Sequence, residues 1–248
     1  TPLWGNHILE NRYATHVVEI QCKSETPKDW DIIGHALGRL LTDGNERPVL
    51  VGDFHRPDIN RLKKFFSSLA TTSGCELCHI VGCTAEAPTL EAALAGHEPK
   101  RKITLTQEEY DRSLASLCDE GAGDVQMVVL GCPHYTLEEI RDVAHMLEGK
   151  RVADGVSLQI WTDMTMQYLA EVNGYAQTIE ASGAHLLNSA CPLVCGRTAY
   201  DLVKTGFLTD GAKQAHYVHT DLNEKNCKVF YGDTKSCVEA ALKGRWEV

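Results

Sequence analysis

The run VQMVVLGCPHYTLEEIRDVAHML, residues 125–147, decides the fold class of this chain. Residues 125–130 form the most strand-like segment in the sequence, and a short apolar run of this kind is typical of a buried strand. Thr136 followed by Glu139 predicts a capping box at the start of a helix. After the cap, apolar side chains recur at helical spacing, at Leu137, Ile140, Val143, Ala144 and Leu147. The run therefore predicts a strand, a short loop that carries Cys132, and a helix.

The same alternation of strand and helix recurs on both sides of this run. Further strands are expected at 16–20, 48–52, 79–82, 156–160, 185–188 and 228–231. Further helices are expected at 30–41, 59–69 and 90–95, from 106 onward, after an N-cap at Asp163, and at 233–242. This order predicts an α/β fold with mainly parallel sheets and flanking helices. The polar stretch 96–102 predicts a first lobe, residues 1–100, and a second lobe, residues 101–248, which carries Cys132 and Cys191.

Length and composition exclude several classes of protein. A chain of 248 residues, 43% apolar and 23% charged, can build a core without disulfides, and no apolar run approaches the roughly 20 residues of a membrane span. The net charge of −10 repels polyanions, so we expect a small-molecule partner and no nucleic acid or membrane partner. Ten cysteines are far fewer than a disulfide scaffold needs, which favours a cytoplasmic protein with reduced thiols. Because the chain opens on Thr1-Pro2, we expect it to be a piece of a longer one.

Two cysteines follow predicted strands and precede proline. Cys132 comes after the strand at 125–130, and Cys191 comes after the strand at 185–188. Ligands of open α/β sheets bind at the carboxyl ends of strands, and proline keeps the preceding residue extended. Thiolates in this context hold iron–sulfur clusters. The alternative is that each is a buried core cysteine, which is the commoner situation for a single cysteine at a strand end.

A denser group of thiols is formed by Cys75, Cys78 and Cys83, together with His79. Its spacing is compatible with zinc, which would make the chain a zinc-binding interaction module. The structural alternative makes Cys78 and Cys83 small core residues of the strand and Cys75 an exposed turn thiol. We favour the structural alternative, because the group leads directly into the apolar run that begins at His79.

Two polar segments could bind an anion. Arg12, in the segment before the first strand, could clamp a carboxylate or phosphate with its forked guanidinium. Lys213 lies in residues 209–217, between a glycine-bounded loop and the last strand, and could also reach an anion. Either side chain could instead be solvated. Neither segment has the glycine pattern of a phosphate-binding loop.

Four stretches together resemble the catalytic or large-subunit domain of the aconitase X family: 130–140 (LGCPHYTLEEI), 79–87, 190–192, and Gly5-x-His7 with Glu10, Asn11 and Arg12. The resemblance implies three-layer lobes and membership of the aconitase superfamily of hydro-lyases. It also implies an iron–sulfur cluster with Cys132 and Cys191 as ligands and a third cysteine ligand outside this chain. Family members carry small or apolar residues at the positions of Cys75, Cys78 and Cys83. A small swivelling domain or subunit completes their active site.

The resemblance implies a dehydratase that eliminates water from a small hydroxy acid. Bacterial members act on cis-3-hydroxy-L-proline, our leading substrate, and archaeal members act on phosphomevalonate, the alternative. An open iron position would help hydroxide to leave. Arg12 and Lys213 are our candidates for the anionic end of the substrate, with Asn11 and His134 as polar neighbours; no base is assigned. Without the third ligand we expect this chain alone to be inactive, and a non-catalytic fragment is the alternative of another class.

Overall fold

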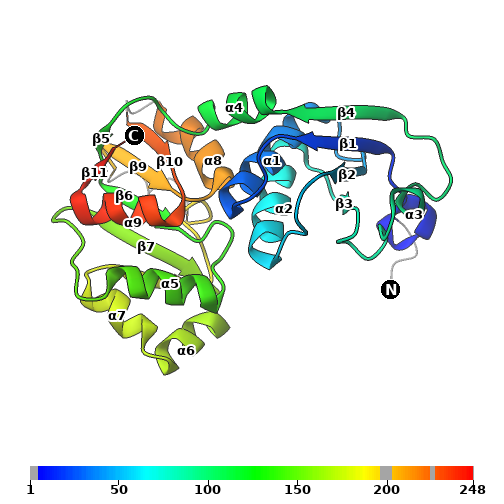
Figure 1. Cartoon of the computed structure of the whole chain (residues 1–248). Helices are drawn as coiled ribbons and strands as arrows, with labels where there is room; N and C mark the ends of the chain where they lie inside the picture. Colours follow the sequence, from blue (N-terminus) through cyan, green and yellow to red (C-terminus); the bar gives the residue numbers. More distant parts are fainter. Residues whose placement is uncertain (1–4, 196–202, 224–226, 248) are drawn as a thin grey trace. The chain divides into compact units, whose positions relative to one another are not determined.

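The computed structural model describes residues 5–195, 203–223 and 227–247 and divides into two compact units, residues 1–114 and 115–248. Each unit contains a parallel sheet with helices on its faces (Figure 1). Within the described residues, no helix is long and apolar enough to cross a bilayer. The expectation of an α/β fold with mainly parallel sheets and flanking helices is confirmed.

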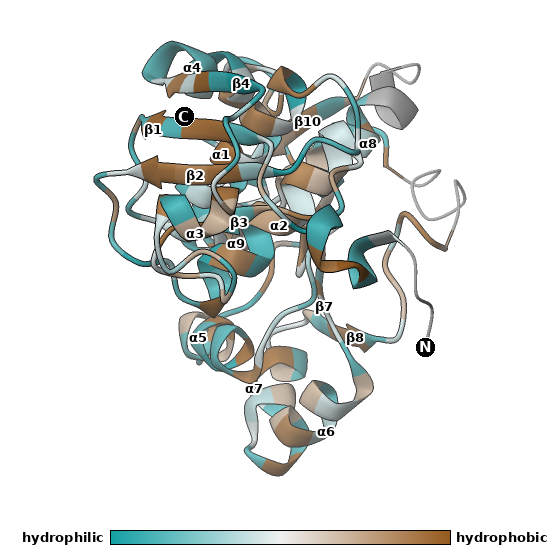
Figure 2. Cartoon of the chain, turned by 90° about the vertical axis from the view of Figure 1, so that its right-hand side faces the viewer, coloured by the Kyte–Doolittle hydropathy of each residue, from teal (hydrophilic) through white to brown (hydrophobic). Residues whose placement is uncertain are grey.

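The first unit is built on four parallel strands in the order β3-β2-β1-β4. The bounds are His16–Gln21 for β1, Pro48–Gly52 for β2, His79–Ile80 for β3 and Arg101–Thr106 for β4. Val17 and Val49 face one side of the sheet and pack with Ala93 of helix α3 (Leu90–Leu94). Val18 and Leu50 point to the opposite side and are fully buried there. Figure 2 shows the apolar character of β1 and β2.

Helices α1 (Pro27–Leu40) and α2 (Ile59–Ser73) pack closely against each other. Thr26 and Asp29 form a complete capping box at the start of α1. The close approach depends on Gly34, because a Cβ added there would lie 2.3 Å from the carbonyl oxygen of Phe65 in α2. A residue larger than glycine would therefore force the two helices apart.

The first unit extends further along the chain than the sequence suggested. Strand β4 pairs with β1 along its whole length, from Arg101 opposite His16 to Thr106 opposite Gln21. Helix α4 (Gln107–Ala115) follows it directly. The predicted boundary after residue 100 falls ahead of β4, whereas the structure divides after Leu114. Strand β4 begins with two exposed charged residues, Arg101 and Lys102. For this reason the sequence of residues 96–102 resembles a polar linker.

The second unit is built on five parallel strands in the order β10-β9-β6-β7-β8. The strands are β6 (Met127–Leu130), β7 (Ser157–Thr162), β8 (His185–Asn188), β9 (Gly206–Thr209) and β10 (Lys228–Tyr231). One face packs against helices α5 (Leu137–Leu147), α6 (Met164–Val172), α7 (Tyr175–Ala181) and α9 (Thr234–Lys243). Helix α8 (Ala212–Asn223) contacts β9 and β10. A separate antiparallel pair joins β5 (Gly123–Asp124) to β11 (Arg245–Trp246).

Local signals predicted one part of this unit and missed another. The strand β6, the capping box of Thr136 and Glu139, and helix α5 agree with the expectation, and Asp163 caps α6. Neither a strand nor a helix was predicted within 209–217, but the structure places Thr209 in the interior strand β9 and Lys213 in helix α8. Strand β9 has only four residues, and an apolar run that short carries no periodicity that identifies it.

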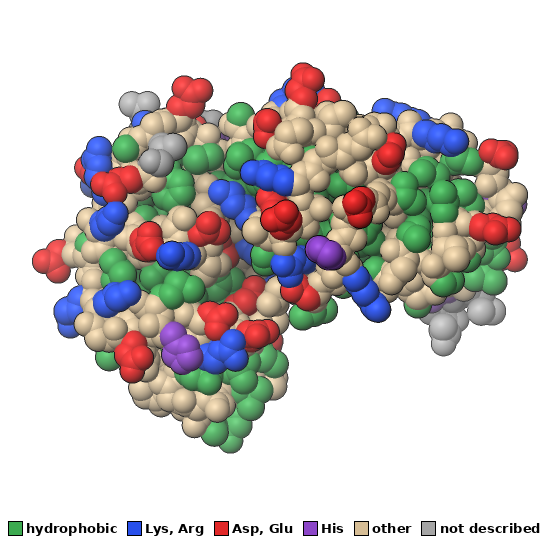
Figure 3. All heavy atoms as spheres, viewed as in Figure 1, with side chains coloured by type: hydrophobic (Ala, Val, Ile, Leu, Met, Phe, Trp, Pro, Cys, Tyr) green, Lys and Arg blue, Asp and Glu red, His purple; other side chains and the backbone are tan. Residues whose placement is uncertain are grey.

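Surface charges are mixed in sign. On the face shown in Figure 3, Lys and Arg side chains lie among Asp and Glu side chains and form no continuous basic patch. The expectation that the partner is not a nucleic acid rests on the net charge of −10 and stays a prediction.

Candidate active site at the carboxyl edge of the second sheet

Five loops meet at the carboxyl edge of the second sheet, one after each strand. This is the edge at which open parallel sheets bind their ligands. The side chains that the loops bring there are Cys132 and His134 after β6, Asp163 after β7, Cys191 after β8, Asp210 after β9, and Thr234 after β10. Both cysteines singled out in the sequence thus follow strands of the same sheet, with β7 between them.

The backbone on each side of Cys132 is closely packed. Gly131 has φ +94°, and a Cβ added there would lie 2.2 Å from the carbonyl oxygen of Trp161. A Cβ added at Gly211 would lie 2.2 Å from the carbonyl oxygen of Cys132. Only glycine fits at either position, because any side chain would overlap a backbone atom. Cys132 itself is 8% exposed.

A buried hydrogen-bond network lies beneath the Cys132 loop. Asp210 accepts hydrogen bonds from the Gly131 amide at 3.4 Å, the Tyr135 hydroxyl at 2.5 Å and the Thr234 hydroxyl at 3.2 Å. Burial, followed by the negative charge of Asp210, raises the pKa of Tyr135 well above its ordinary value. The phenol therefore stays protonated and remains a donor to the carboxylate. Neither Asp210 nor Tyr135 was selected from the sequence, because nothing in it indicated that β9 lies beside β6.

The loop that carries Cys191 begins with a left-handed residue. Ser189 has φ +64°, and its amide donates to the carbonyl of Thr162 at 3.3 Å. The amide of Cys195 donates to the carbonyl of Cys191 at 3.0 Å, which closes one helical turn. Cys191 is partly exposed. The cysteine thus starts a compact turn directly after the strand end.

One hydrogen bond links the two cysteine loops. Nε2 of His134, two residues after Cys132, donates to the carbonyl of Ala190, the residue before Cys191, at 2.8 Å. A carbonyl can only accept, so this ring nitrogen carries the proton. Segments 56 residues apart in the sequence are therefore held side by side at the edge.

Asp163 lies next to this link at the start of α6. Hydrogen bonds from the amides of Met166 and Thr165, with a smaller contribution from the nearby His134, lower the pKa of its carboxyl group. Asp163 is therefore a charged group at the edge, and the sequence had identified it only as a helix cap.

A cavity of about 370 Å³ lies beside the Cys191 loop. Its walls run along the sheet from Met127 and Ser157, at the amino ends of β6 and β7, to Leu187 of β8 and to Pro192 and Cys195 of the loop. Neither Cys132 nor Cys191 lines it. A volume of this order suits a small organic molecule.

The remaining candidate residues lie at different places. Lys213 is in the first turn of α8, after β9, and has no ion-pair partner among the described residues. Arg12, in the first unit, pairs with Glu86, and Asn11 donates from its side chain to the carbonyl of Gly5 at 2.9 Å. Lys213 therefore belongs to the same sheet edge as the two cysteine loops, whereas Arg12 and Asn11 belong to the other unit.

The thiols of the Cys75–Cys83 segment are engaged differently. Cys75 donates to the carbonyls of Glu46 and Leu77, both at 3.4 Å, and Cys78 donates to the carbonyl of His79 at 3.6 Å. Burial raises the pKa of both thiols, so neither forms a thiolate readily. Cys75 is 8% exposed, which corrects the expectation of an exposed turn thiol: the Glu46 loop covers it. Cys83 is partly exposed in the turn after β3, which corrects the expectation that it is a core residue of this strand.

His79 completes this structural arrangement. Its Nε2 donates to the carbonyl of Arg12 at 2.6 Å, and burial lowers its pKa. Among the residues that the structure describes, no three or more His, Cys, Asp or Glu side chains are grouped to hold a metal ion. The observed contacts of this segment are thus those of a structural cluster.

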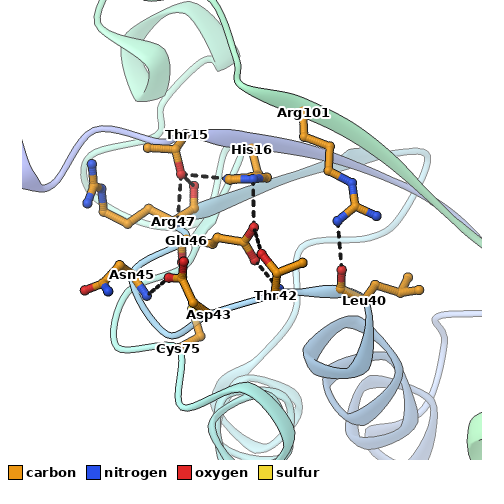
Figure 4. Close-up of polar contacts among 10 residues, drawn as sticks. All are labelled: Thr15, His16, Leu40, Thr42, Asp43, Asn45, Glu46, Arg47, Cys75 and Arg101. Atoms are coloured by element: carbon orange, nitrogen blue, oxygen red, sulfur yellow. Dashed lines mark hydrogen bonds and ion pairs between the residues drawn. The ribbon is translucent and has the colours of Figure 1, made fainter.

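A second buried polar cluster lies at the amino end of the first sheet (Figure 4). His16 contacts Oε1 of Glu46 through Nε2 at 3.1 Å, and Thr15 contacts Nδ1 of His16 at 2.8 Å. Burial lowers the pKa of His16. Burial also opposes ionisation of Glu46, but hydrogen bonds from the side chain and amide of Thr42 outweigh it and lower the pKa of that carboxyl group. The cluster ties β1 to the Thr42–Arg47 loop at the end of the sheet away from the usual ligand edge.

The fold and this edge define a ligand-binding α/β protein with two parallel-sheet units and cysteine-bearing loops on one of them. Residues 14–115 match the aconitase X second domain, and residues 125–243 match the aconitase X third domain. The chain therefore belongs to the aconitase X family, which confirms the resemblance found in the sequence. The two matched regions agree with the division after Leu114.

Relatives with named activities fall into two groups. The chain is 30% identical to cis-3-hydroxy-L-proline dehydratase of Pseudomonas aeruginosa, over 98% of this chain and 42% of that protein. It is 26% identical to the phosphomevalonate dehydratase large subunit of Thermococcus kodakarensis, over 88% of this chain and 53% of the relative. A crystal structure of Thermococcus kodakaraensis aconitase X in its holo-form matches with a TM-score of 0.79 and 24% identity, covering 97% of this chain and 58% of that one. The chain thus spans about half the length of the relatives it matches.

Proposed function

We propose that this chain is part of an iron–sulfur hydro-lyase that eliminates water from a small hydroxy acid. The observation that carries the proposal is the hydrogen bond from His134 to Ala190, which brings the loops of Cys132 and Cys191 together. Family membership supports the reaction class, because the relatives are named as dehydratases. The relatives are longer than this chain, so the proposal concerns the whole protein.

The residues at the edge fit an iron–sulfur cluster. Two thiols from adjacent loops supply soft ligands, and the backbone of Cys132 is fixed from both sides. A cluster ligated by three cysteines keeps an open iron position, which, when the cluster is bound, would supply a Lewis acid for the departing hydroxide. Cys132 and Cys191 are two of these ligands in our proposal, and the third lies outside this chain.

The chain's own residues would bind and orient the substrate. Lys213 can hold a substrate carboxylate at the sheet edge, since no described carboxylate competes for it. His134 would be a polar neighbour with a fixed ring, because Nε2 is engaged by Ala190. Arg12 and Asn11 stay candidates for the same anionic end. For Arg12 to act there, it would exchange its pairing with Glu86 for the substrate.

We propose cis-3-hydroxy-L-proline as the substrate. A phosphorylated acid calls for several cationic side chains, and the basic side chains described in the edge loops and in the first turn of α8 are His134 and Lys213. The cavity of about 370 Å³ beside the Cys191 loop is large enough for a small organic molecule. Phosphomevalonate is the second candidate, because relatives of 25% to 29% identity are named phosphomevalonate dehydratase large subunits.

A small swivelling domain or subunit is the proposed protein partner, since several relatives are named large subunits. We also propose a cytoplasmic location. The support for it is that the ten cysteines form no disulfide bond, which is typical of proteins in a reducing compartment.

The decisive experiment uses the full-length protein purified without oxygen. Iron and acid-labile sulfide are measured first, and dehydration of cis-3-hydroxy-L-proline is then compared with that of phosphomevalonate. We expect bound iron and sulfide and turnover of the hydroxyproline. If only phosphomevalonate is dehydrated, the proposed substrate is wrong and phosphomevalonate takes its place. Zinc near one equivalent would favour the interaction module, and absence of both metal and turnover would favour a non-catalytic protein.

A further inference from the structure

A buried carboxylate lies directly behind the proposed cluster ligand. Asp210 is 2% exposed, and its carboxylate accepts from Gly131, Tyr135 and Thr234. Gly131 is the residue before Cys132, and Tyr135 is the third residue after it. The two arms of the Cys132 loop are thus attached to a single side chain from the neighbouring strand β9.

The Tyr135 end of the loop is attached a second time, to β7. The amide of Tyr135 donates to the carbonyl of Trp161 at 3.0 Å, and the hydroxyl of Thr162 donates to the carbonyl of Tyr135 at 2.7 Å. On the other side, Gly211, the residue after Asp210, packs against the backbone of Cys132. The thiol-bearing residue is therefore held between β7 and β9.

Burial of a carboxylate is costly unless its oxygens are hydrogen-bonded, and here both are. A turn can be closed by backbone bonds alone, as the Cys191 loop is by the bond from Cys195 to Cys191. In the Cys75–Cys83 segment, the thiols of Cys75 and Cys78 donate to backbone carbonyls. The buried carboxylate is found behind Cys132, one of the two cysteines that are proposed to bind iron.

We propose that Asp210 is a positioning residue that fixes the Cys132 backbone in the geometry required for cluster binding, with Tyr135 as its main partner. This inference rests on the proposed function, because it requires Cys132 to be a ligand. Outer partners that orient metal ligands typically contribute about 10- to 100-fold to metal affinity or activity. Asp210 does so through the Gly131 amide on one side of the ligand and the Tyr135 hydroxyl on the other.

The test compares Asp210→Asn and Tyr135→Phe with wild-type full-length protein after anaerobic reconstitution with limiting iron and sulfide. The control is Asp119→Asn, because Asp119 is also a carboxylate that accepts a backbone hydrogen bond, from the Val229 amide at 2.7 Å, at the amino end of the same sheet. The measurements are iron and sulfide per chain, the electron paramagnetic resonance spectrum of the reduced protein normalised per iron, and thermal unfolding of the apoprotein.

We expect Asp210→Asn to lower the affinity for the cluster by about tenfold or more and to change the normalised spectrum. Tyr135→Phe should change the cluster affinity and the normalised spectrum in the same direction, but by a smaller amount. Asp119→Asn should change neither the affinity nor the spectrum. A merely structural residue would lower apoprotein stability and leave the spectrum of the bound cluster unchanged. That result, or equal cluster binding in all variants, would overturn the inference.

The experiment distinguishes failure of the proposed function from failure of the inference about Asp210. If wild-type protein itself binds no iron, the proposed function fails, whatever the variants do. If wild type binds a cluster and Asp210→Asn does not fold, Tyr135→Phe decides the question, since it removes one hydroxyl and keeps the buried ring. An unchanged affinity and spectrum in Tyr135→Phe would then overturn the inference.

Discussion

The two groups of cysteines in this chain differ in where they lie on their sheets. Cys132 and Cys191 are 59 positions apart and follow the carboxyl ends of two strands, in loops joined by the bond from His134 to Ala190. Cys75 and Cys78 are three positions apart, are buried, and donate hydrogen bonds to carbonyls. Spacing in the sequence favoured the second group, whereas the position at a sheet edge favours the first.

The contacts of the two groups also differ. Burial raises the pKa of Cys75 and Cys78, so neither forms a thiolate readily. The backbone of Cys132 is packed against glycines, and its loop is tied to a buried carboxylate. In our proposal, the location of each thiol in the sheet is therefore a better guide to metal binding than close spacing of cysteines.

The largest expected effect comes from removing the thiols one at a time. Cys132→Ala or Cys191→Ala in the full-length protein should abolish the visible absorbance of the cluster, because each removes a proposed ligand. Cys75→Ala and Cys78→Ala should retain it. The check is iron per chain with the absorbance spectrum, for variants shown to be folded by circular dichroism. If the first pair of variants keeps the cluster absorbance and the second pair loses it, Cys75 and Cys78 are the ligands instead of Cys132 and Cys191.

Local signals were sufficient for the part of the fold around Cys132. The strand β6 and helix α5 follow from an apolar run and from Thr136 with Glu139, and every one of these signals lies within 23 residues. Cys132 was therefore placed correctly at a strand end from sequence alone. The same is true of Cys191 after β8.

Contacts between residues far apart in the sequence could not be predicted. Asp210 contacts Gly131 across 79 positions, and this contact exists only because the short strand β9 inserts between β6 and β10. The sequence Thr209-Asp210-Gly211 after an apolar run was the available signal, since it resembles the other strand ends. Burial of Cys75 by the Glu46 loop also depends on residues 29 positions away.

A smaller effect should separate two glycines that lie near cysteines of the two groups. Gly211→Ala should cost about 3 kcal/mol in the free energy of unfolding, because its Cβ would overlap the Cys132 carbonyl oxygen at 2.2 Å. Gly82→Ala, next to Cys83, meets no atom within 4 Å and should cost about 1 kcal/mol for its φ of +71°. Urea unfolding of both variants tests this difference. Equal costs would mean that the Cys132 loop is not tightly packed.

The smallest effect concerns pH, and it probes the first unit, where the structural cysteines lie. Burial lowers the pKa of His16 and His79 below the ordinary value of about 6.5, so both are neutral in the folded protein above that pH. As the pH falls below about 6.5, the two histidines bind protons in the unfolded chain but stay neutral in the folded chain. Folding stability therefore falls with decreasing pH, by up to about 1.4 kcal/mol per pH unit for each histidine, until the lowered folded pKa is reached.

Urea unfolding between pH 7.5 and 5 measures this slope, with His16→Gln as the informative variant. His16 lies between Thr15 and Glu46, and the short contact of each ring nitrogen with a neighbouring oxygen fits a neutral ring that accepts at Nδ1 and donates at Nε2 (Figure 4). Replacement by glutamine should flatten the slope by the His16 contribution. His7→Gln, at an exposed position, should leave it unchanged. If the slope is the same in wild type and His16→Gln, protonation of His16 does not lower the free energy of unfolding. The contacts of His16 with Thr15 and Glu46 would then be looser than their distances indicate.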